Sequence, residues 1–411
     1  MSLYPRYLQP KIEEALKDTP VVCILGPRQV GKSTLSQQLS PRRTYLTFDD
    51  EAIRTAARQD PAGFVQGLPE YVTLDEVQRV PELLLAIKAE VDRHRTSGRF
   101  LLTGSANLLL LPKVKESLAG RVEIFYLQPL TEAEKNHYQP DFLPRLLAQK
   151  IKPDIGQAQA AIADVADRLC AGGYPEPNTR TPARARTWYM QYLNTIIQND
   201  VKDIAAIRDE GELQRLAELL ALRTANLLNV NSLAGDLGLR RETTDKYIGL
   251  LEHLFLLRRL PAWHSNLSKR LIKTPKVHWL DSGLAAVLNN LSPKDWVSFS
   301  TDFGPLLESF VVQQIIAQAA WLDEPLQFSH YRDKDQVEVD LVIEQGRSLW
   351  GIEVKKAASI QTKDGEGLQR LATQAGSSFK GGALIYCGNN CLPLKTANCY
   401  AVPISWLWQK N

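Results

Sequence analysis

The sequence Gly26-Pro27-Arg28-Gln29-Val30-Gly31-Lys32-Ser33 matches the pattern G-x-x-x-x-G-K-[ST], which is typical of a phosphate-binding loop between a strand and a helix. An apolar run, Val21–Leu25, precedes it, and a predicted helix over Ser33–Leu39 follows it. The glycines let backbone amides turn inward around a phosphate, and Lys32 can reach the β- and γ-phosphate oxygens. We predict that residues 26–33 and Thr34 bind ATP and that Ser33 is a ligand of Mg²⁺.

Short apolar runs alternate with helical stretches, which is typical of a parallel sheet covered by helices. The predicted strands are Val21–Leu25, Tyr45–Phe48, Tyr71–Leu74, Phe100–Thr103 and Glu123–Leu127. The fold class is therefore α/β in this part of the chain.

Two adjacent acids, Asp75 and Glu76, follow the third predicted strand. Asp75 is placed to hold Mg²⁺, and Glu76 is placed to polarise the attacking water. The alternative is an N-cap pair for the next helix. The polar residues after the fourth strand that could contact the γ-phosphate are Thr103, Ser105 and Asn107, of which Ser105 is included among the predicted nucleotide ligands.

Length and composition give the outer limits. The chain has 411 residues, which suits two or three domains, and 44% hydrophobic with 23% charged residues is typical of a globular protein. It has no apolar run long enough to span a membrane and no signal peptide pattern, so we expect a cytoplasmic protein without membrane contact. The five cysteines are scattered, which favours reduced thiols over disulfides or a zinc site.

A basic segment lies in the middle of the chain. Between Asn229 and Leu280 there are nine Lys or Arg and four Asp or Glu, a net charge of +5 against +3 for the whole chain. Residues 232–248 predict a short helix, a glycine turn and a second helix. The second helix packs through Tyr247, Leu250, Leu251 and Leu254, so the side chains expected to face outward are Arg241, Thr244, Asp245 and Lys246.

This pattern resembles a helix-turn-helix. The later runs Leu256–Leu260 and Val277–Leu280, with the basic stretch Lys269–Lys276 between them, look like the wing of a winged-helix domain. We predict contact with DNA or RNA through the second helix and the lysines of the wing. A protein-contact or internal lid role is the alternative.

A pair of acids and a lysine stand out in the C-terminal part. Residues 338–343 alternate at period two, Gly346 provides a turn, and residues 349–355 return. This hairpin can bring Asp340 beside Glu353 and Lys355. The two acids can hold Mg²⁺ while the lysine orients or deprotonates water, which are the parts needed for phosphodiester hydrolysis.

The N-terminal motifs resemble AAA-type ATPases with an additional strand between the two Walker strands. They resemble more closely a prokaryotic family in which this module precedes a C-terminal domain of unknown function. The residues that carry this resemblance start at Gly26 and continue with Thr47-Phe48-Asp49-Asp50, Leu74–Gln78, Leu102–Ser105, Gly120-Arg121, Pro129–Glu132 and Gly172–Pro175. The resemblance implies that Arg121 projects into the nucleotide of a neighbouring subunit in a homo-oligomer. A surface ion pair and a contact within the same subunit are the alternatives.

The order Glu308, Asp340, Glu353 and Lys355 resembles the PD-(D/E)xK nuclease superfamily, although Val339 replaces the proline of the signature. This resemblance implies that Glu308 belongs to the catalytic set and that Gln369 is a position for a further polar group. The predicted domains are an AAA-type P-loop core (1–140), a helical lid or connector (141–211), a winged-helix-like domain (212–300) and a small α/β nuclease-like domain (301–411).

These patterns favour ATP-dependent nucleic-acid processing with a metal-dependent nuclease-like domain. The alternative is a nucleotide-dependent switch or scaffold with an inactive nuclease-like domain and a protein-binding winged helix.

Overall fold

The computed structural model describes residues 3–105, 120–155, 162–200, 209–298 and 300–409. The chain divides into two compact units. The N-terminal unit comprises Arg6–Pro129 with His253–Phe255, and the C-terminal unit comprises Met1–Pro5, Leu130–Glu252 and Leu256–Asn411. The predicted division into four domains stays a prediction.

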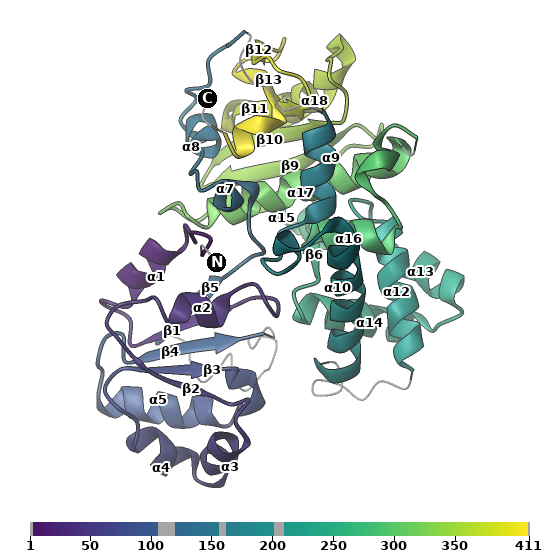
Figure 1. Cartoon of the computed structure of the whole chain (residues 1–411). Coiled ribbons are helices and arrows are strands. Elements are labelled where there is room, and N and C mark those ends of the chain that lie inside the picture. The colour runs from purple at the N-terminus through teal and green to yellow at the C-terminus, as the bar shows by residue number, and fades with distance from the viewer. Residues whose placement is uncertain (1–2, 106–119, 156–161, 201–208, 299, 410–411) are drawn as a thin grey trace. The chain divides into compact units, whose positions relative to one another are not determined.

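The N-terminal unit is built on a parallel sheet of five strands in the order β2-β3-β4-β1-β5 (Figure 1). The strands are β1 (Val21–Leu25), β2 (Thr44–Thr47), β3 (Val72–Asp75), β4 (Phe100–Gly104) and β5 (Val122–Tyr126). The helices are α1 (Gln9–Ala15), α2 (Lys32–Ser36), α3 (Glu51–Gln59), α4 (Pro61–Gln66) and α5 (Leu83–Arg93).

Each predicted strand of this unit is present, β1 with the predicted ends and the others with ends that differ by at most one residue. Strand β4 pairs with both β1 and β3, so an additional strand lies between the two Walker strands, as the resemblance implies. Every residue of β1 and β4 is buried, which explains why these strands are continuous apolar runs rather than alternating ones. The sheet is that of a P-loop nucleotide-binding fold.

The first part of the C-terminal unit is mainly helical. Its helices are α7 (Glu132–Lys135), α8 (Phe142–Leu147), α9 (Ile162–Ala171), α10 (Pro182–Thr195), α12 (Glu210–Leu222), α13 (Val230–Leu237), α14 (Arg241–His253), α15 (Leu267–Ile272) and α16 (Ser282–Leu288). Two strands, β6 (Leu257–Leu260) and β7 (Lys276–Trp279), form an antiparallel pair. The predicted wing strands therefore do pair, but helix α15 lies between them.

The second part of the C-terminal unit is a mixed sheet of six strands in the order β12-β13-β11-β10-β9-β8. Its strands are β8 (Gln327–Arg332), β9 (Glu338–Gln345), β10 (Ser348–Lys355), β11 (Phe379–Tyr386), β12 (Leu392–Pro393) and β13 (Cys399–Pro403), and its helices are α17 (Ser300–Ala319) and α18 (Glu366–Ala375). The predicted hairpin is present as β9 and β10, and Gly346 adopts φ +59° at its turn. All five cysteines are free thiols.

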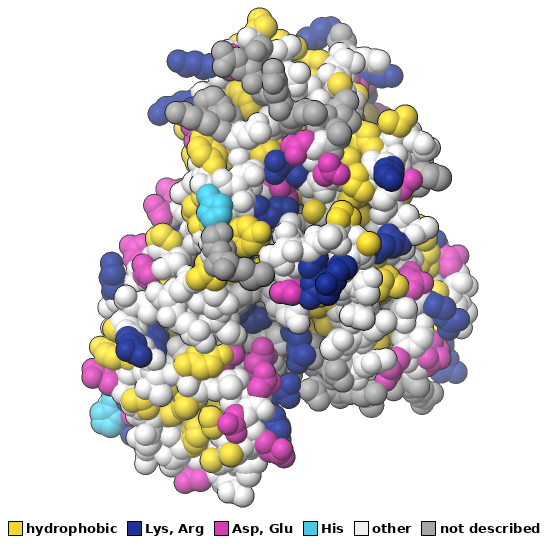
Figure 2. Space-filling model, in the orientation of Figure 1, with side chains coloured by type: hydrophobic (Ala, Val, Ile, Leu, Met, Phe, Trp, Pro, Cys, Tyr) yellow, Lys and Arg dark blue, Asp and Glu magenta, His cyan; other side chains and the backbone are white. Residues whose placement is uncertain are grey.

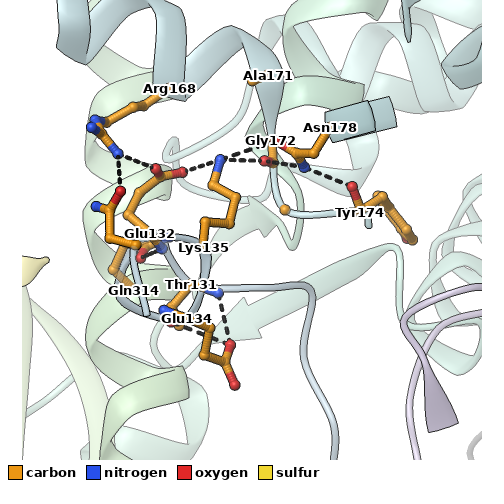
Figure 3. Close-up of polar contacts among 12 residues, drawn as sticks. Thr131, Glu132, Glu134, Lys135, Arg168, Ala171, Gly172, Tyr174, Asn178 and Gln314 are labelled. Carbon is orange, nitrogen blue, oxygen red and sulfur yellow. Dashed lines mark hydrogen bonds and ion pairs between the residues drawn. The ribbon is translucent and has the colours of Figure 1, made fainter. Parts of the chain in front are cut away.

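The motifs Pro129–Glu132 and Gly172–Pro175 lie far apart in the sequence but contact each other in the structure. The amide of Leu130 donates to the carbonyl of Gly173 at 2.7 Å. Figure 3 shows the Glu132 carboxylate, which is 1% exposed, between Lys135 and Arg168. The carboxylate lies 2.5 Å from Lys135 Nζ and 2.8 Å from Arg168 Nη1. Both oxygens have cationic partners, and these partners offset the cost of burying the carboxylate.

Lys135 extends this network to the glycine motif. Its Nζ donates to the carbonyl of Gly172 at 2.9 Å, and Asn178 Nδ2 donates to the carbonyl of Tyr174 at 2.7 Å (Figure 3). The Gln314 side chain accepts from the amide of Glu132 at 2.8 Å. The two motifs therefore connect α7, α9 and α17.

A substitution at Gly172 tests the importance of this close packing. Gly172 adopts φ +69°, and a Cβ there would lie 2.4 Å from Tyr189 Oη and 2.6 Å from Asp281 Oδ1. We expect Gly172→Ala to lower the free energy of unfolding by about 2 kcal/mol or more, through backbone strain and overpacking. Gly235→Ala is the control, because a Cβ at this helical position meets nothing within 4 Å. It should leave stability unchanged or raise it by about 0.5–1 kcal/mol. Urea unfolding measures both, and equal effects would contradict the prediction.

Candidate functional site

The predicted phosphate-binding loop connects β1 to α2. A Cβ at Gly26 would lie 2.2 Å from the carbonyl oxygen of Leu127, and Gly31 adopts φ +95°, so both glycines are required by the local backbone. Lys32 is 4% exposed, and its Nζ donates to the carbonyls of Gly26 and Pro27 at 3.0 and 2.8 Å. The ammonium group thus binds carbonyls of the same loop in which we predict that it contacts phosphate.

Asp75 lies at the end of β3 and receives three hydrogen bonds. Ser33 Oγ donates to its Oδ2 at 3.0 Å, and Tyr45 Oη and Thr103 Oγ1 also donate to the carboxylate. These groups come from α2, β2 and β4, so the strand order brings them to one end of the sheet. A hydroxyl beside a carboxylate is an oxygen donor pair of the kind that Mg²⁺ prefers, so Ser33 and Asp75 fit this ion.

Glu76 follows Asp75 in a left-handed backbone conformation, with φ 57°. Its Oε2 accepts from Ser105 Oγ at 2.9 Å and from Gln78 Nε2, and Gln78 Nε2 also donates to Ser105 Oγ at 2.9 Å. The structure therefore brings Ser105 to Glu76 and Thr103 to Asp75. The third sensor candidate, Asn107, lies outside the described residues.

Arg121 lies just before β5, and its Nε is 2.5 Å from Asp92 Oδ1, with 28% of the arginine side chain exposed. Arg121 thus forms an ion pair within the chain, which is one of the alternatives to a contact with a neighbouring subunit. The contact with a neighbouring subunit stays a prediction.

The predicted helix-turn-helix corresponds to α13, Gly238 in a left-handed conformation, and α14. The predicted packing residues are buried, and Arg241, Asp245 and Lys246 are exposed. The prediction for Thr244 is wrong, because this residue is 0% exposed and its Oγ1 donates to the carbonyl of Arg240 at 3.1 Å. The short hydroxyl side chain turns back onto the helix.

The basic stretch between β6 and β7 lies against the C-terminal sheet. Arg270 Nη1 is 2.7 Å from Glu344 Oε2, and Lys273 Nζ donates to the carbonyl of Arg332 at 3.2 Å. Lys276 is 3% exposed. These cations have protein partners, so the expectation that the lysines of this stretch all face a phosphate backbone does not fit the structure. Lys269 is the exposed exception. In Figure 2, the Lys and Arg side chains on the face drawn are dispersed among acidic ones.

The C-terminal acids and the lysine do come together. Glu353 and Lys355 lie on β10, and Lys355 Nζ donates to Glu353 Oε1 at 3.0 Å. Asp340, on the neighbouring strand β9, accepts from the amide of Val354 at 2.8 Å. Glu308, on α17, lies 2.8 Å from the Nζ of Lys276, which is itself 3.4 Å from Asp340 Oδ1.

The side chains of this cluster do not form a ready metal-binding site among the described residues. Within the described ranges, no group of three or more His, Cys, Asp or Glu side chains has the arrangement of a metal site. Gln369 is exposed, and it lines a groove of about 500 Å³ together with Arg370 and Lys395. Asp340 and Glu353 as ion ligands therefore stay a proposal.

Burial changes the protonation of the two glutamates of the cluster. It raises the pKa of Glu353 to about 8, with repulsion from Asp340 adding to the shift and Lys355 opposing it. Burial also raises the pKa of Glu308 well above its usual range. A group whose pKa is higher in the folded chain stabilises the fold at low pH and loses this contribution as the pH rises through the folded value.

We therefore expect Glu353→Gln to be more stable than the wild type at about pH 8, by about 1 kcal/mol or more, with the difference shrinking towards about pH 5. The measurement is the free energy of unfolding across this pH range. The exposed Glu366→Gln on α18 is the control and should follow the wild-type profile. A Glu353→Gln profile parallel to that of the wild type would rule out this titration.

Sequence reasoning missed three residues, namely Tyr45, Gln78 and Lys276. Tyr45 was assigned to a strand and Gln78 to a motif, but only the strand order reveals that they contact Asp75 and Glu76. Lys276 is predicted among the surface charges, and no sequence pattern indicates its burial, because all four residues of β7 are buried instead of alternating.

The fold and the site define an AAA-type P-loop domain, the class of domain that binds ATP. A family model described as "AAA domain" matches residues 18–135. Models described as domains of unknown function match residues 162–295 (DUF8612) and 303–407 (DUF4143). Two uncharacterized proteins, from Mycobacterium bovis and Mycobacterium tuberculosis, are each 30% identical over 352 residues, which cover 85% of this chain and 73% of the relative. The chain belongs to the family of these mycobacterial proteins.

Solved structures give a weaker likeness. A Walker-type ATPase of Pyrococcus abyssi is 16% identical, with coverage of 70% of this chain and 96% of that one and a TM-score of 0.40. The Cdc6p protein of Pyrobaculum aerophilum is 14% identical, with 70% and 92% coverage and a TM-score of 0.24. No helix in the described part of the chain has the length and apolar character needed to cross a membrane.

Proposed function

We propose that the N-terminal unit hydrolyses Mg²⁺-ATP, with Lys32 on the phosphates, Ser33 and Asp75 on the ion, and Glu76 as the general base. The observation that supports this most strongly is the arrangement at the end of β3. Ser33 lies 3.0 Å from Asp75, and Ser105 lies 2.9 Å from the adjacent Glu76. A carboxylate for the ion and a separate group that activates or positions the attacking water are parts that P-loop enzymes use for phosphoryl transfer to water.

Each residue then has a distinct task. Lys32 exchanges the carbonyls of Gly26 and Pro27 for phosphate oxygens. Glu76 accepts the proton of the attacking water, and Ser105 orients the Glu76 carboxylate or contacts the γ-phosphate. Mg²⁺, when bound, neutralises charge on the phosphates. In an oligomer, Arg121 exchanges Asp92 for the nucleotide of a neighbouring subunit.

Two substitutions separate binding from hydrolysis. Lys32→Ala should abolish nucleotide binding or turnover, whereas Glu76→Gln should retain ATP and lose turnover by about 10²- to 10⁴-fold, the contribution of a general base. Phosphate release and binding of a fluorescent ATP analogue measure the two effects. Glu82→Gln, a nearby exposed glutamate, is the control and should match the wild type. Wild-type turnover by Glu76→Gln would exclude Glu76 as the base.

We also propose that α13 and α14 bind nucleic acid, so that ATP hydrolysis accompanies work on DNA or RNA. The supporting observation is the exposed start of α14, where Arg240 and Arg241 are followed by Lys246. A helix that presents its N-terminal cations in this way suits the major groove or a phosphate backbone.

This proposal predicts a defined salt dependence. Each phosphate contact on duplex DNA contributes about −0.9 to the slope of log affinity against log salt concentration. The double variant Arg241→Glu/Lys246→Glu should therefore flatten the slope by about 2. Lys17→Glu/Arg184→Glu changes the net charge equally at exposed positions elsewhere and is the matched control. Fluorescence anisotropy with a labelled duplex measures both. Equal slopes would move the interface away from α14.

A second candidate is a nucleotide-dependent switch or scaffold whose C-terminal unit does not cleave. The observation that favours it is the position of Lys276 Nζ, 2.8 Å from Glu308 and 3.4 Å from Asp340. A cleavage assay on DNA and RNA with Mg²⁺ or Mn²⁺, with and without ATP, distinguishes this switch or scaffold from an active nuclease. Cleavage that is lost in Lys355→Ala favours the nuclease, and no cleavage on any substrate favours the switch.

A further inference from the structure

The ammonium group of Lys276 is surrounded by carboxylates. Its Nζ lies 2.8 Å from Glu308 Oε1, 3.1 Å from Glu338 Oε2 and 3.4 Å from Asp340 Oδ1. The lysine side chain is 4% exposed. A charged amine can remain at such depth only because acidic partners replace its lost hydration.

This cluster contains more carboxyl groups than cationic groups. The carboxyl groups belong to Glu308, Glu338, Asp340 and Glu353, and the cationic groups belong to Lys276, Arg332 and Lys355. Lys355 pairs with Glu353 Oε1 at 3.0 Å, and Arg332 pairs with Glu338 at 2.8 Å. The second oxygen of Glu353 is buried, and no described group donates a hydrogen bond to it. Glu353 as a whole is 8% exposed. The Oε2 atom of Glu353 is thus a buried carboxylate oxygen without a donor among the described residues.

The lysine and the acids come from different parts of the chain. Lys276 begins β7 and lies within residues 162–295, which one family model matches, whereas the acids lie within residues 303–407, which another matches. The segment before β7 is attached to the sheet by other contacts. Trp263 Nε1 and Arg270 Nη1 both donate to Glu344, at 3.2 and 2.7 Å. The ammonium group is therefore delivered by a neighbouring element that docks on the sheet.

We propose that Lys276 is a built-in cation that competes with a divalent metal ion for Glu308, Asp340 and Glu353, so that this site takes up the ion only when the Lys276 ammonium leaves. Two cations so close repel strongly at low dielectric, so the lysine and the ion exclude one another. The inference rests on the proposed role of Asp340 and Glu353 as ion ligands, and its test measures ion binding rather than cleavage or ATP turnover.

The test is a titration of the full chain with Mn²⁺ in the absence of nucleotide, measured by isothermal titration calorimetry. Binding is assigned to this site only if it is lost when Asp340→Asn is added, because Ser33 and Asp75 can also take the ion. Lys276→Gln should bind Mn²⁺ at this site about tenfold or more tightly than the wild type, since the competing charge is removed. Lys269→Gln is the matched control, an exposed lysine of the same segment, and should bind as the wild type does.

The outcomes separate the inference from the ion-ligand proposal. If the wild type binds Mn²⁺ in an Asp340-dependent way and as tightly as Lys276→Gln does, the competition is contradicted. The role of the carboxylates as ion ligands is then still supported. No Asp340-dependent binding in a folded Lys276→Gln would overturn both. If Lys276→Gln folds only when Mn²⁺ is present, the ion has replaced the ammonium, as proposed. The wild type supplies a test that needs no lysine variant, because micromolar Asp340-dependent binding there would also contradict the competition.

Discussion

The burial of charge is the constraint on which the C-terminal unit depends. Lys276, Glu132 and Glu353 are each at least nine-tenths buried, yet each belongs to a residue type that strongly prefers water. Glu132 is matched by two cations and Lys276 by three carboxylates. Because removal of one member of such a set leaves an uncompensated charge, these groups restrict how the helical part and the sheet can be joined.

The N-terminal unit solves a related problem with neutral donors. Asp75 is 5% exposed and accepts from Ser33, Tyr45 and Thr103, all of them hydroxyl groups. Hydroxyls can hold a carboxylate in place and still give way to an ion, since they carry no charge to be displaced. This difference suits a site that binds and releases a ligand in each cycle, whereas the ion pairs around Glu132 suit a permanent joint.

Much of the fold could be predicted from the sequence, because its signals are local. The loop at Gly26–Ser33, the buried runs of β1 and β4 and the hairpin of β9 and β10 each depend on a few adjacent residues. What the sequence did not reveal depends on the order of the strands and on contacts between distant segments. Tyr45 reaches Asp75 because β2 pairs with β3, and Lys276 reaches Glu308 because β7 lies near α17. Thr244 was misplaced because helical periodicity does not show that a hydroxyl bonds back to its own helix.

The position of Lys276 also bears on how this chain can be divided or recombined. The two family models place a boundary between residues 295 and 303, and a fragment cut there would contain the acids without their amine. The sequence boundary is thus not an energetic one. A gene fusion that joined the C-terminal sheet to a different partner would leave these buried acids without their amine unless the new partner supplied a counter-charge.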